Sequence, residues 1–224
     1  MPLFLNERQV GFDTTRVGFP GIGDCMALAL QDQGGLFGFH VMPGDAVKIA
    51  EFVRFMHGSV HYTGSLTHLC GCSRWAKRYS SQGGYADWKA EMTTIGRALK
   101  YTGPVSGFDA SHGTSLKKTD SLYIEFRVQG SAVSFHYKRS SKVTGDTDRT
   151  GVASPTDDLR EIDLDRKAMN EAGKRGEAYA EKYQLTPRLK YGHTPDVKLI
   201  KTTRGNKGDF HQVKSADVVS FNLA

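Results

Sequence analysis

A clear alternation of large apolar and small residues lies near the N-terminal end of the chain. Met26, Leu28 and Leu30 alternate with smaller side chains, and a second alternation over residues 37–41 follows the polar and glycine-rich segment 32–35. A period of two is typical of strands, and Asp, Gln and Gly are common turn residues. The pattern predicts a β-hairpin in which each strand has one large apolar face and one face of smaller residues.

Other elements follow from the same reasoning. Apolar residues at three- and four-residue spacing predict helices over residues 45–56, 86–101 and 157–185, the last broken near Gly173 or Gly176. Alternating runs predict a strand within residues 60–69, and a second hairpin formed by 122–128 and 132–137 that extends the sheet. We therefore expect an α+β fold, an α/β sandwich with a largely antiparallel or mixed β-sheet core and helices packed around it.

The length and composition are typical of one domain. A chain of 224 residues with 38% hydrophobic content buries a substantial core. We expect a single domain over residues 1–224, with a flexible polar connection at 140–156 and a basic C-terminal segment at 186–224.

Cys25 and His40 have the side chains of this hairpin that are suited to catalysis. A two-residue turn at Asp32 and Gln33 would place them directly opposite each other, with Cβ atoms roughly 5 Å apart. A four-residue turn over 32–35 would leave them diagonal on one face, and a three-residue turn would place them on different faces. The sequence leaves these registers open.

A thiol beside an imidazole supports covalent catalysis at a carbonyl carbon. The imidazole favours the attacking thiolate and later protonates the leaving group. With Cys25 opposite His40, Ala27 would face Gly38, and these small residues together with Ala29 would leave an open floor for a substrate. The alternative is that Cys25 is a buried hydrophobic residue and His40 a hydrogen-bonded strand-end residue, which is common for both types.

The segment before Cys25 has features that suit a nucleophile. Gly21 and Gly23 allow a sharp backbone turn, so that amide N–H groups near Cys25 and Met26 would face a developing oxyanion. Asp24 is the immediate neighbour of the thiol.

Two stretches of the hairpin resemble the active-site region of the CheD family, the bacterial chemoreceptor glutamine deamidases. These are Gly-Asp-Cys-Met-Ala-Leu-Ala-Leu at 23–30 and Gly-Gly-Leu-Phe-Gly-Phe-His-Val-Met-Pro at 34–43. The family has a Gly-Ser-Cys turn, where Asp24 replaces the Ser here, and a helix after the hairpin. The resemblance covers about residues 11–60. Cytotoxic necrotizing factors and the Burkholderia lethal factor have a similar separation between Cys and His.

The resemblance implies a CheD-like fold and a glutamine deamidase, as in secreted bacterial effectors and toxins. Cys25 would attack a side-chain amide, His40 would protonate the departing ammonia, and water would hydrolyse the thioester. An amine in place of water would give transglutamination, and the same pair would also serve a protease.

This chain departs from the family in two places. CheD proteins have a Thr six residues before the Cys that helps to position the His, and Phe19 stands there. A backbone carbonyl, Thr14 or Thr15 would have to orient the imidazole instead, the threonines approaching from a strand over residues 11–17. A Phe-Gly-Gly segment after the helix is missing, so the chemoreceptor substrate is not implied, and the protein substrate stays unidentified.

The charge balance suggests a second class of function. The net charge is +6. Basic residues in the C-terminal segment are Arg188, Lys190, Lys198, Lys201, Arg204, Lys207 and Lys214. Such a surface would attract an acidic protein, phosphoinositide head groups or nucleic acid, although no nucleic-acid motif accompanies it and nucleic acid is the least favoured partner. The alternatives to the enzyme are thus a non-catalytic basic binding module and a merely solvated basic face.

The sequence favours neither a metal site nor a cofactor. Histidines and cysteines cluster at His57, His61, His68, Cys70 and Cys72, but Cys70 and Cys72 form a C-x-C pair without a second pair to close a zinc site, so we expect an ordinary loop. Asp109 and His112 lie in a Gly-rich loop where such residues are usually solvated.

Cysteine usage and hydropathy bear on the compartment. Three cysteines cannot all pair with each other, the apolar start at residues 2–5 is too short for a signal peptide, and no run approaches the roughly 20 residues that cross a bilayer. We expect a soluble protein of the bacterial cytoplasm, exported without a signal peptide, with the host cytosol as a site of action.

Overall fold

The computed structural model describes residues 3–5, 7, 9–44, 49–79, 84–111, 121–140, 149–151, 159–162, 187–188, 193–195 and 211–223. Its strands are β1 (Leu3–Phe4), β2 (Gln9–Asp13), β3 (Arg16–Ile22), β4 (Met26–Asp32), β5 (Gly35–Val41), β6 (Leu66–Ser73), β7 (Pro104–Gly107), β8 (Ser121–Gln129), β9 (Ala132–Ser140), β10 (Arg149–Gly151), β11 (Leu159–Ile162), β12 (Pro187–Arg188), β13 (His193–Pro195), β14 (His211–Gln212) and β15 (Val219–Asn222). Its helices are α1 (Ile49–His57), α2 (Trp75–Arg78) and α3 (Gly84–Ala98), with a short 3-10 turn at Ser215–Asp217. The fold is mixed α+β, with most of the described residues in sheets, as the sequence predicts.

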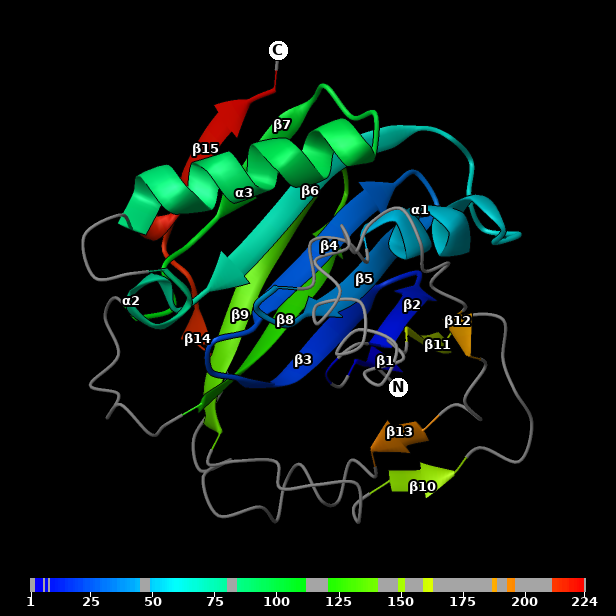
Figure 1. The fold of residues 1–224 in the computed structure, drawn as a ribbon, viewed down its shortest axis with the longest axis horizontal. Coiled ribbons are helices and arrows are strands. Elements are labelled where there is room, and N and C mark those ends of the chain that lie inside the picture. Colours follow the sequence, from blue (N-terminus) through cyan, green and yellow to red (C-terminus); the bar gives the residue numbers. More distant parts are fainter. Residues whose placement is uncertain are drawn as a thin grey trace, which may run out of the picture.

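Two large sheets form the body of the protein (Figure 1). The first has eight strands in the order β12-β11-β2-β5-β4-β6-β7-β15, and the second has five in the order β1-β3-β8-β9-β14. Most neighbours are antiparallel, whereas β6 and β7, and β1 and β3, are parallel. The sheets are therefore of the mixed kind.

The eight-stranded sheet is covered on both faces. On one face α1 and α3 pack over it, where Phe37 meets Phe55 of α1 with ring centroids 6.2 Å apart, and the indole N–H of Trp88 in α3 donates to the Gly71 carbonyl. The other face packs against the five-stranded sheet, where the Phe19 ring of β3 meets the His40 ring of β5 with centroids 6.2 Å apart. The alternation along β4 thus separates residues that contact helices from residues that contact the second sheet.

The hairpins are confirmed, with one correction. Residues of β4 pair with β5, and residues of β8 pair with β9 around Gly130, whose φ of +60° suits a tight turn. However, β8 and β9 belong to the five-stranded sheet and do not extend the sheet of the first hairpin. Each hairpin has an apolar face, and the two faces bury each other by stacking.

The strand and helix predictions elsewhere hold in part. The predicted strand within 60–69 occurs later, at Leu66–Ser73, so Cys70 and Cys72 lie in a strand and not in a loop. The predicted strand over 11–17 is divided in two: residues 11–13 belong to β2 and residues 16–17 to β3, with Thr14 and Thr15 in the turn between them.

Helices α1 and α3 confirm two of the predicted helices, except that α3 ends at Ala98 and not at Tyr101. Residues 45–48 of the first predicted helix lie outside the described residues. The third helix, over 157–185, is wrong at Leu159–Ile162, which pairs as β11 with β2. The remainder of that helix, most of the 140–156 connection and most of the 186–224 segment lie outside the described residues. In the described part of the chain, no helix is long and apolar enough to span a membrane.

Candidate active site

The register of the β4–β5 hairpin places Cys25 and His40 diagonally on one face. Asp32 pairs with Gly35 and Ala27 with His40, so Cys25 precedes the first ladder pair. The diagonal relation is the one expected for a four-residue turn, although Asp32 and Gly35 pair with each other and the turn itself has two residues. The predicted direct Cys25–His40 pairing is wrong. Both side chains are buried, with 1% of Cys25 and 0% of His40 exposed.

Asp32 explains this register. Its carboxylate accepts hydrogen bonds from the backbone N–H groups of Thr63 at 2.9 Å and Gly64 at 3.2 Å. These bonds hold Asp32 inside the strand, and the turn therefore consists of residues 33 and 34. Partners 31 residues away in the sequence fix the turn, and no local pattern reports them.

The backbone carbonyl of Leu5 orients His40. Its oxygen lies 2.8 Å from Nδ1 of the imidazole, and because a carbonyl only accepts, Nδ1 carries the proton. Nε2 is then the basic nitrogen; it is buried, and within the described residues it has no hydrogen-bond partner. The Phe19 ring meets the imidazole edge to face, with centroids 6.2 Å apart. The imidazole is thus fixed in the tautomer that leaves Nε2 able to take a proton.

Burial lowers the pKa of His40 to about 4. The bond to Leu5 opposes this shift, Arg78 adds to it through its positive charge, and Asp24 opposes it. The imidazole is therefore neutral at neutral pH, which is the state that a general base requires.

Arg78 of α2 is a residue of this site that the sequence analysis does not identify. Its Nη1 donates to the carbonyl of Asp24 at 3.0 Å and to the carbonyl of Val41 at 3.3 Å. Arg78 thereby joins the start of the strand that carries Cys25 to the end of the strand that carries His40. Its charge also interacts with Cys25. A neighbouring cation favours the thiolate form of a cysteine.

Glu91 of α3 holds the Arg78 side chain. Nε and Nη2 of the guanidinium donate to the two carboxylate oxygens at 2.8 and 2.6 Å, and the Tyr79 hydroxyl donates to the same carboxylate at 2.6 Å. Burial raises the pKa of Glu91, but the hydrogen bonds and charge of Arg78 outweigh it and leave the pKa lowered. Both partners are therefore charged, and the fork of two bonds fixes the guanidinium plane.

Asp109 fixes the beginning of α2. Its Oδ1 accepts from the backbone N–H of Trp75, the first residue of the helix, at 3.0 Å, and from that of Ser111 at 2.9 Å. Asp109 was expected to be solvated; it is instead a cap that positions the helix carrying Arg78. No sequence motif joins these residues, since the contact depends on β7 lying beside β6.

Asp24 and Met26 flank the thiol differently. Asp24 is exposed, and its carboxylate accepts from the Cys25 thiol at 3.9 Å. The Met26 side chain points to the helix-covered face, and its backbone is paired on both sides, with Val41 and with Ser73. Asp24 therefore lies at the site, and the Met26 side chain does not.

Thr15 is distant from the imidazole. Its N–H and hydroxyl donate to the Asp13 carboxylate at 2.8 and 2.9 Å, and Asp13 pairs with Leu36, at the end of β5 opposite to His40. Among the three alternatives for orienting His40, the structure contains the backbone carbonyl, that of Leu5.

The expected open floor beside the pair is wrong. A Cβ placed on Gly38 would lie 2.6 Å from a Leu5 methyl carbon and 3.2 Å from the Phe19 ring. Ala27 and Ala29 are 0% exposed. These residues are small because the second sheet packs closely against them.

The second cluster of histidines and cysteines is dispersed. Burial raises the pKa of the Cys70 and Cys72 thiols, so both are unreactive at neutral pH. The histidines have separate partners: His57 stacks on Tyr62, His61 stacks on Phe12, and His68 is hydrogen-bonded to Ser106. Within the described ranges, which exclude His112, no three His, Cys, Asp or Glu side chains gather as metal ligands would.

Comparison with models of known protein families and with curated proteins finds no match to this chain. The candidate site is therefore defined by its own residues and their geometry, and by a hairpin sequence that resembles the CheD family.

Proposed function

We propose that this protein is a cysteine-dependent amidase with a CheD-like fold that deamidates glutamine in a protein substrate. One observation carries the proposal: the thiol of Cys25 shares a buried face with an imidazole whose Nδ1 is anchored, and a fixed guanidinium lies beside both. A thiol, an oriented base and a fixed cation are the groups that covalent catalysis at an amide uses.

The residues support a two-step mechanism. The Cys25 thiol first moves along its shared face to Nε2 of neutral His40, which has no hydrogen-bond partner within the described residues. It transfers its proton to Nε2, and the thiolate attacks the carboxamide carbon. The imidazolium then returns that proton to the amide nitrogen, the C–N bond breaks, and ammonia leaves with a thioester on Cys25. Water, deprotonated by His40, hydrolyses the thioester to glutamate and regenerates the thiol.

Arg78 has an electrostatic role in this mechanism. A histidine whose pKa is about 4 is a poor permanent counter-ion for a thiolate. The guanidinium, charged at all relevant pH values, supplies the positive charge that stabilises the thiolate. Because this same charge disfavours imidazolium, the proton on His40 is readily given up to the leaving group.

Substrate would approach from the side of the exposed Asp24. Residues 23–25 form a bend ahead of β4, in which buried Cys25 directly follows the exposed Asp24. A protein substrate in a reducing compartment, as for a secreted effector acting in a host cytosol, is consistent with a catalytic free thiol.

The test compares proteins of candidate target cells incubated with wild type, Cys25→Ser, His40→Ala and the control Cys72→Ala. We expect peptides in which Gln becomes Glu only with wild type and the control, together with release of ammonia. Cross-linked or cleaved peptides that depend on Cys25 would instead identify a transglutaminase or a protease. Identical peptide spectra for wild type and Cys25→Ser would contradict the enzyme proposal altogether.

A further inference from the structure

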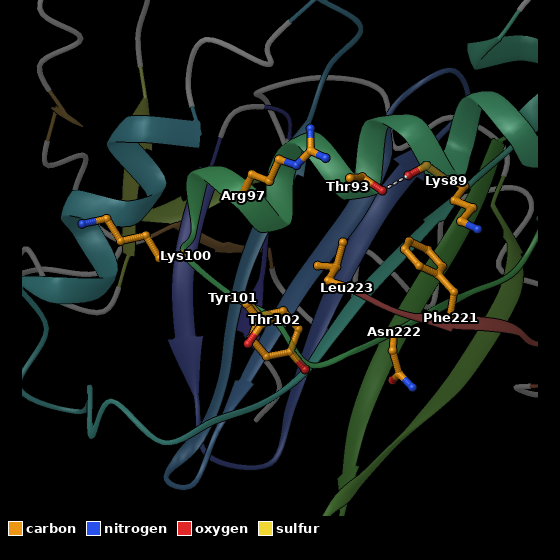
Figure 2. Close-up of a pocket in the computed structure, with 9 residues that line it drawn as sticks. All are labelled: Lys89, Thr93, Arg97, Lys100, Tyr101, Thr102, Phe221, Asn222 and Leu223. Atoms are coloured by element: carbon orange, nitrogen blue, oxygen red, sulfur yellow. Dashed lines mark hydrogen bonds between the residues drawn. The ribbon is translucent and has the colours of Figure 1, made fainter.

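A groove lies between α3 and β15, and its basic residues come from α3 and the turn that follows it (Figure 2). It has a volume of about 490 Å³, and its lining includes Lys89, Arg97 and Lys100 but no acidic residue. Within the described residues, none of the ion pairs involves these three cations. The groove therefore holds three positive charges that no described carboxylate neutralises.

The cations form a line and do not converge on a point. Lys89 and Arg97 are eight residues apart on α3, with Thr93 between them, so their Cα atoms are about 12 Å apart along the helix axis. Lys100 follows just beyond the helix end. A single phosphate requires donors that converge within hydrogen-bond distance, whereas carboxylates four residues apart on an extended peptide are about 13 Å apart. The spacing matches an extended acidic segment.

Lys100 occupies a position that favours glycine. Its φ is +53°, and it is the one described non-glycine residue with positive φ. The bonds from Lys100 N–H to the Arg97 carbonyl and from Tyr101 N–H to the Gly96 carbonyl define a Schellman ending, where glycine is the usual residue. A lysine there has a conformational cost that glycine would not have, so its side chain is not explained by helix termination.

The helix dipole does not explain the set of cations either. Cations at the C-terminal turn of a helix are stabilising, which would account for Arg97 and Lys100. Lys89 lies two turns earlier, beyond the reach of the terminal dipole, and its ammonium lies over the Phe221 ring, 5.2 Å from the centroid. The line of charge thus extends past the region in which the dipole acts.

The aromatic residues of the groove are not available for stacking on bases. One face of Phe221 is covered by Lys89, and its ring meets Trp88 at 87°. Tyr101 is buried, and its hydroxyl oxygen lies 3.0 Å from the Thr67 carbonyl and 2.9 Å from the Pro104 carbonyl, which share its one proton. Single-stranded nucleic acid needs exposed aromatic faces, so a peptide fits these residues better.

The lower wall of the groove is the outermost described strand of the eight-stranded sheet. β15 pairs with β7 on its inner side and ends the strand order. Extended peptides bind to such edges through main-chain hydrogen bonds, with side-chain contacts giving specificity.

We infer that the α3–β15 groove binds an acidic, extended segment of a partner protein, with Lys89, Arg97 and Lys100 contacting its carboxylates. The segment lies along β15 beneath the basic side of α3. This binding is independent of catalysis at Cys25, so it stands whether or not the deamidase proposal holds.

The test uses a fluorescein-labelled peptide of alternating Glu and Val, with a Gln-Val peptide as the uncharged control, and measures anisotropy in low and high salt. We expect wild type to bind the Glu peptide, more weakly in high salt, and not the Gln peptide. Lys89→Gln, Arg97→Gln and Lys100→Gly should each weaken binding about three- to fivefold, which is typical of one exposed charge pair. Lys214→Gln, an equal loss of charge outside the groove, should leave binding unchanged.

The Lys100→Gly variant distinguishes an effect on peptide binding from an effect on stability. Glycine should raise the melting temperature because it relieves the positive φ, yet the variant should bind the peptide more weakly. Unchanged binding in all three groove variants, or no binding of the Glu peptide by wild type, would overturn the inference. Displacement of the peptide by an oligodeoxynucleotide or inorganic phosphate at lower concentrations than by unlabelled Glu peptide would also overturn it.

Discussion

The side chains of His40 and Arg78 are both buried, yet they have opposite charge states. His40 has a carbonyl as its hydrogen-bond partner, which cannot compensate a positive charge fully, so its pKa falls to about 4. Arg78 has the Glu91 carboxylate, whose hydrogen bonds and charge outweigh the effect of burial and raise the pKa of Arg78. Beside the thiol, the two groups are complementary: the cation is suited to stabilise a thiolate, and the neutral base is suited to accept a proton.

The neutral state of His40 predicts acid sensitivity. Its folded-state pKa is about 4, below the unfolded value of 6.5, so the unfolded chain binds more protons between these values. The free energy of unfolding should therefore be unaffected by His40 above pH 6.5, and it should fall by about 3 kcal/mol as the pH decreases to 4. Denaturant titrations at several pH values in this range measure the free energy of unfolding. This free energy should depend less steeply on pH for His40→Asn, which keeps a donor for the Leu5 carbonyl but does not titrate. Equal slopes for wild type and His40→Asn would show that His40 is not the group responsible.

At the scale of elements, the short helix α2 has a positioning role out of proportion to its length. It is four residues long, too short to be stable by itself, and it bears Arg78 in its last turn. Asp109 holds its first residue, and Glu91 of α3 holds Arg78. The placement of the guanidinium thus depends on three segments meeting.

Asp109 should consequently affect Cys25 without touching it. Asp109→Ala removes the cap of α2 and should cost about 1 kcal/mol of stability, whereas Asp109→Asn keeps an acceptor oxygen and should cost less. Asp109→Ala should also slow alkylation of Cys25 by iodoacetamide below neutral pH, as Arg78→Met should, because the guanidinium loses its fixed position. Loss of stability with an unaltered alkylation rate would contradict the positioning role and leave Asp109 purely structural.

At the scale of the whole molecule, the candidate site lies between two stacked sheets. The small residues of β4 and β5 allow the five-stranded sheet to approach, which brings Leu5 to His40 and Phe19 to the imidazole edge. Close packing of the layers therefore orients the base.

Gly38 tests this packing. Gly38→Ala would place a methyl group 2.6 Å from a Leu5 carbon, so the sheets must separate or Leu5 must move, at a cost of about 1–3 kcal/mol. Gly23→Ala is the matched control, since its methyl group would meet only the Lys77 ammonium at 3.8 Å and the Gly21 carbonyl at 4.0 Å, and it should cost less than about 0.5 kcal/mol. Chemical denaturation measures both variants. If Gly38→Ala proves as stable as wild type, the face is open, as the sequence alone suggested.

The sequence by itself determined the local elements and the face that Cys25 and His40 share. Period-two alternation fixes which residues of a strand lie together, and helical spacing similarly located α1 and α3. The same helical spacing was misleading at Leu159–Ile162, where pairing with β2 in the sheet overrode the local pattern.

Tertiary structure alone decided the register, the orienting group and the electrostatics of the site. The turn depends on Asp32 bonding to Thr63, and the imidazole depends on a carbonyl, which every residue has and no motif marks. Arg78 reaches the Asp24 carbonyl across 54 residues of sequence. Contacts between distant segments form only when the layers pack, so the pattern of neighbouring residues along the sequence does not predict them.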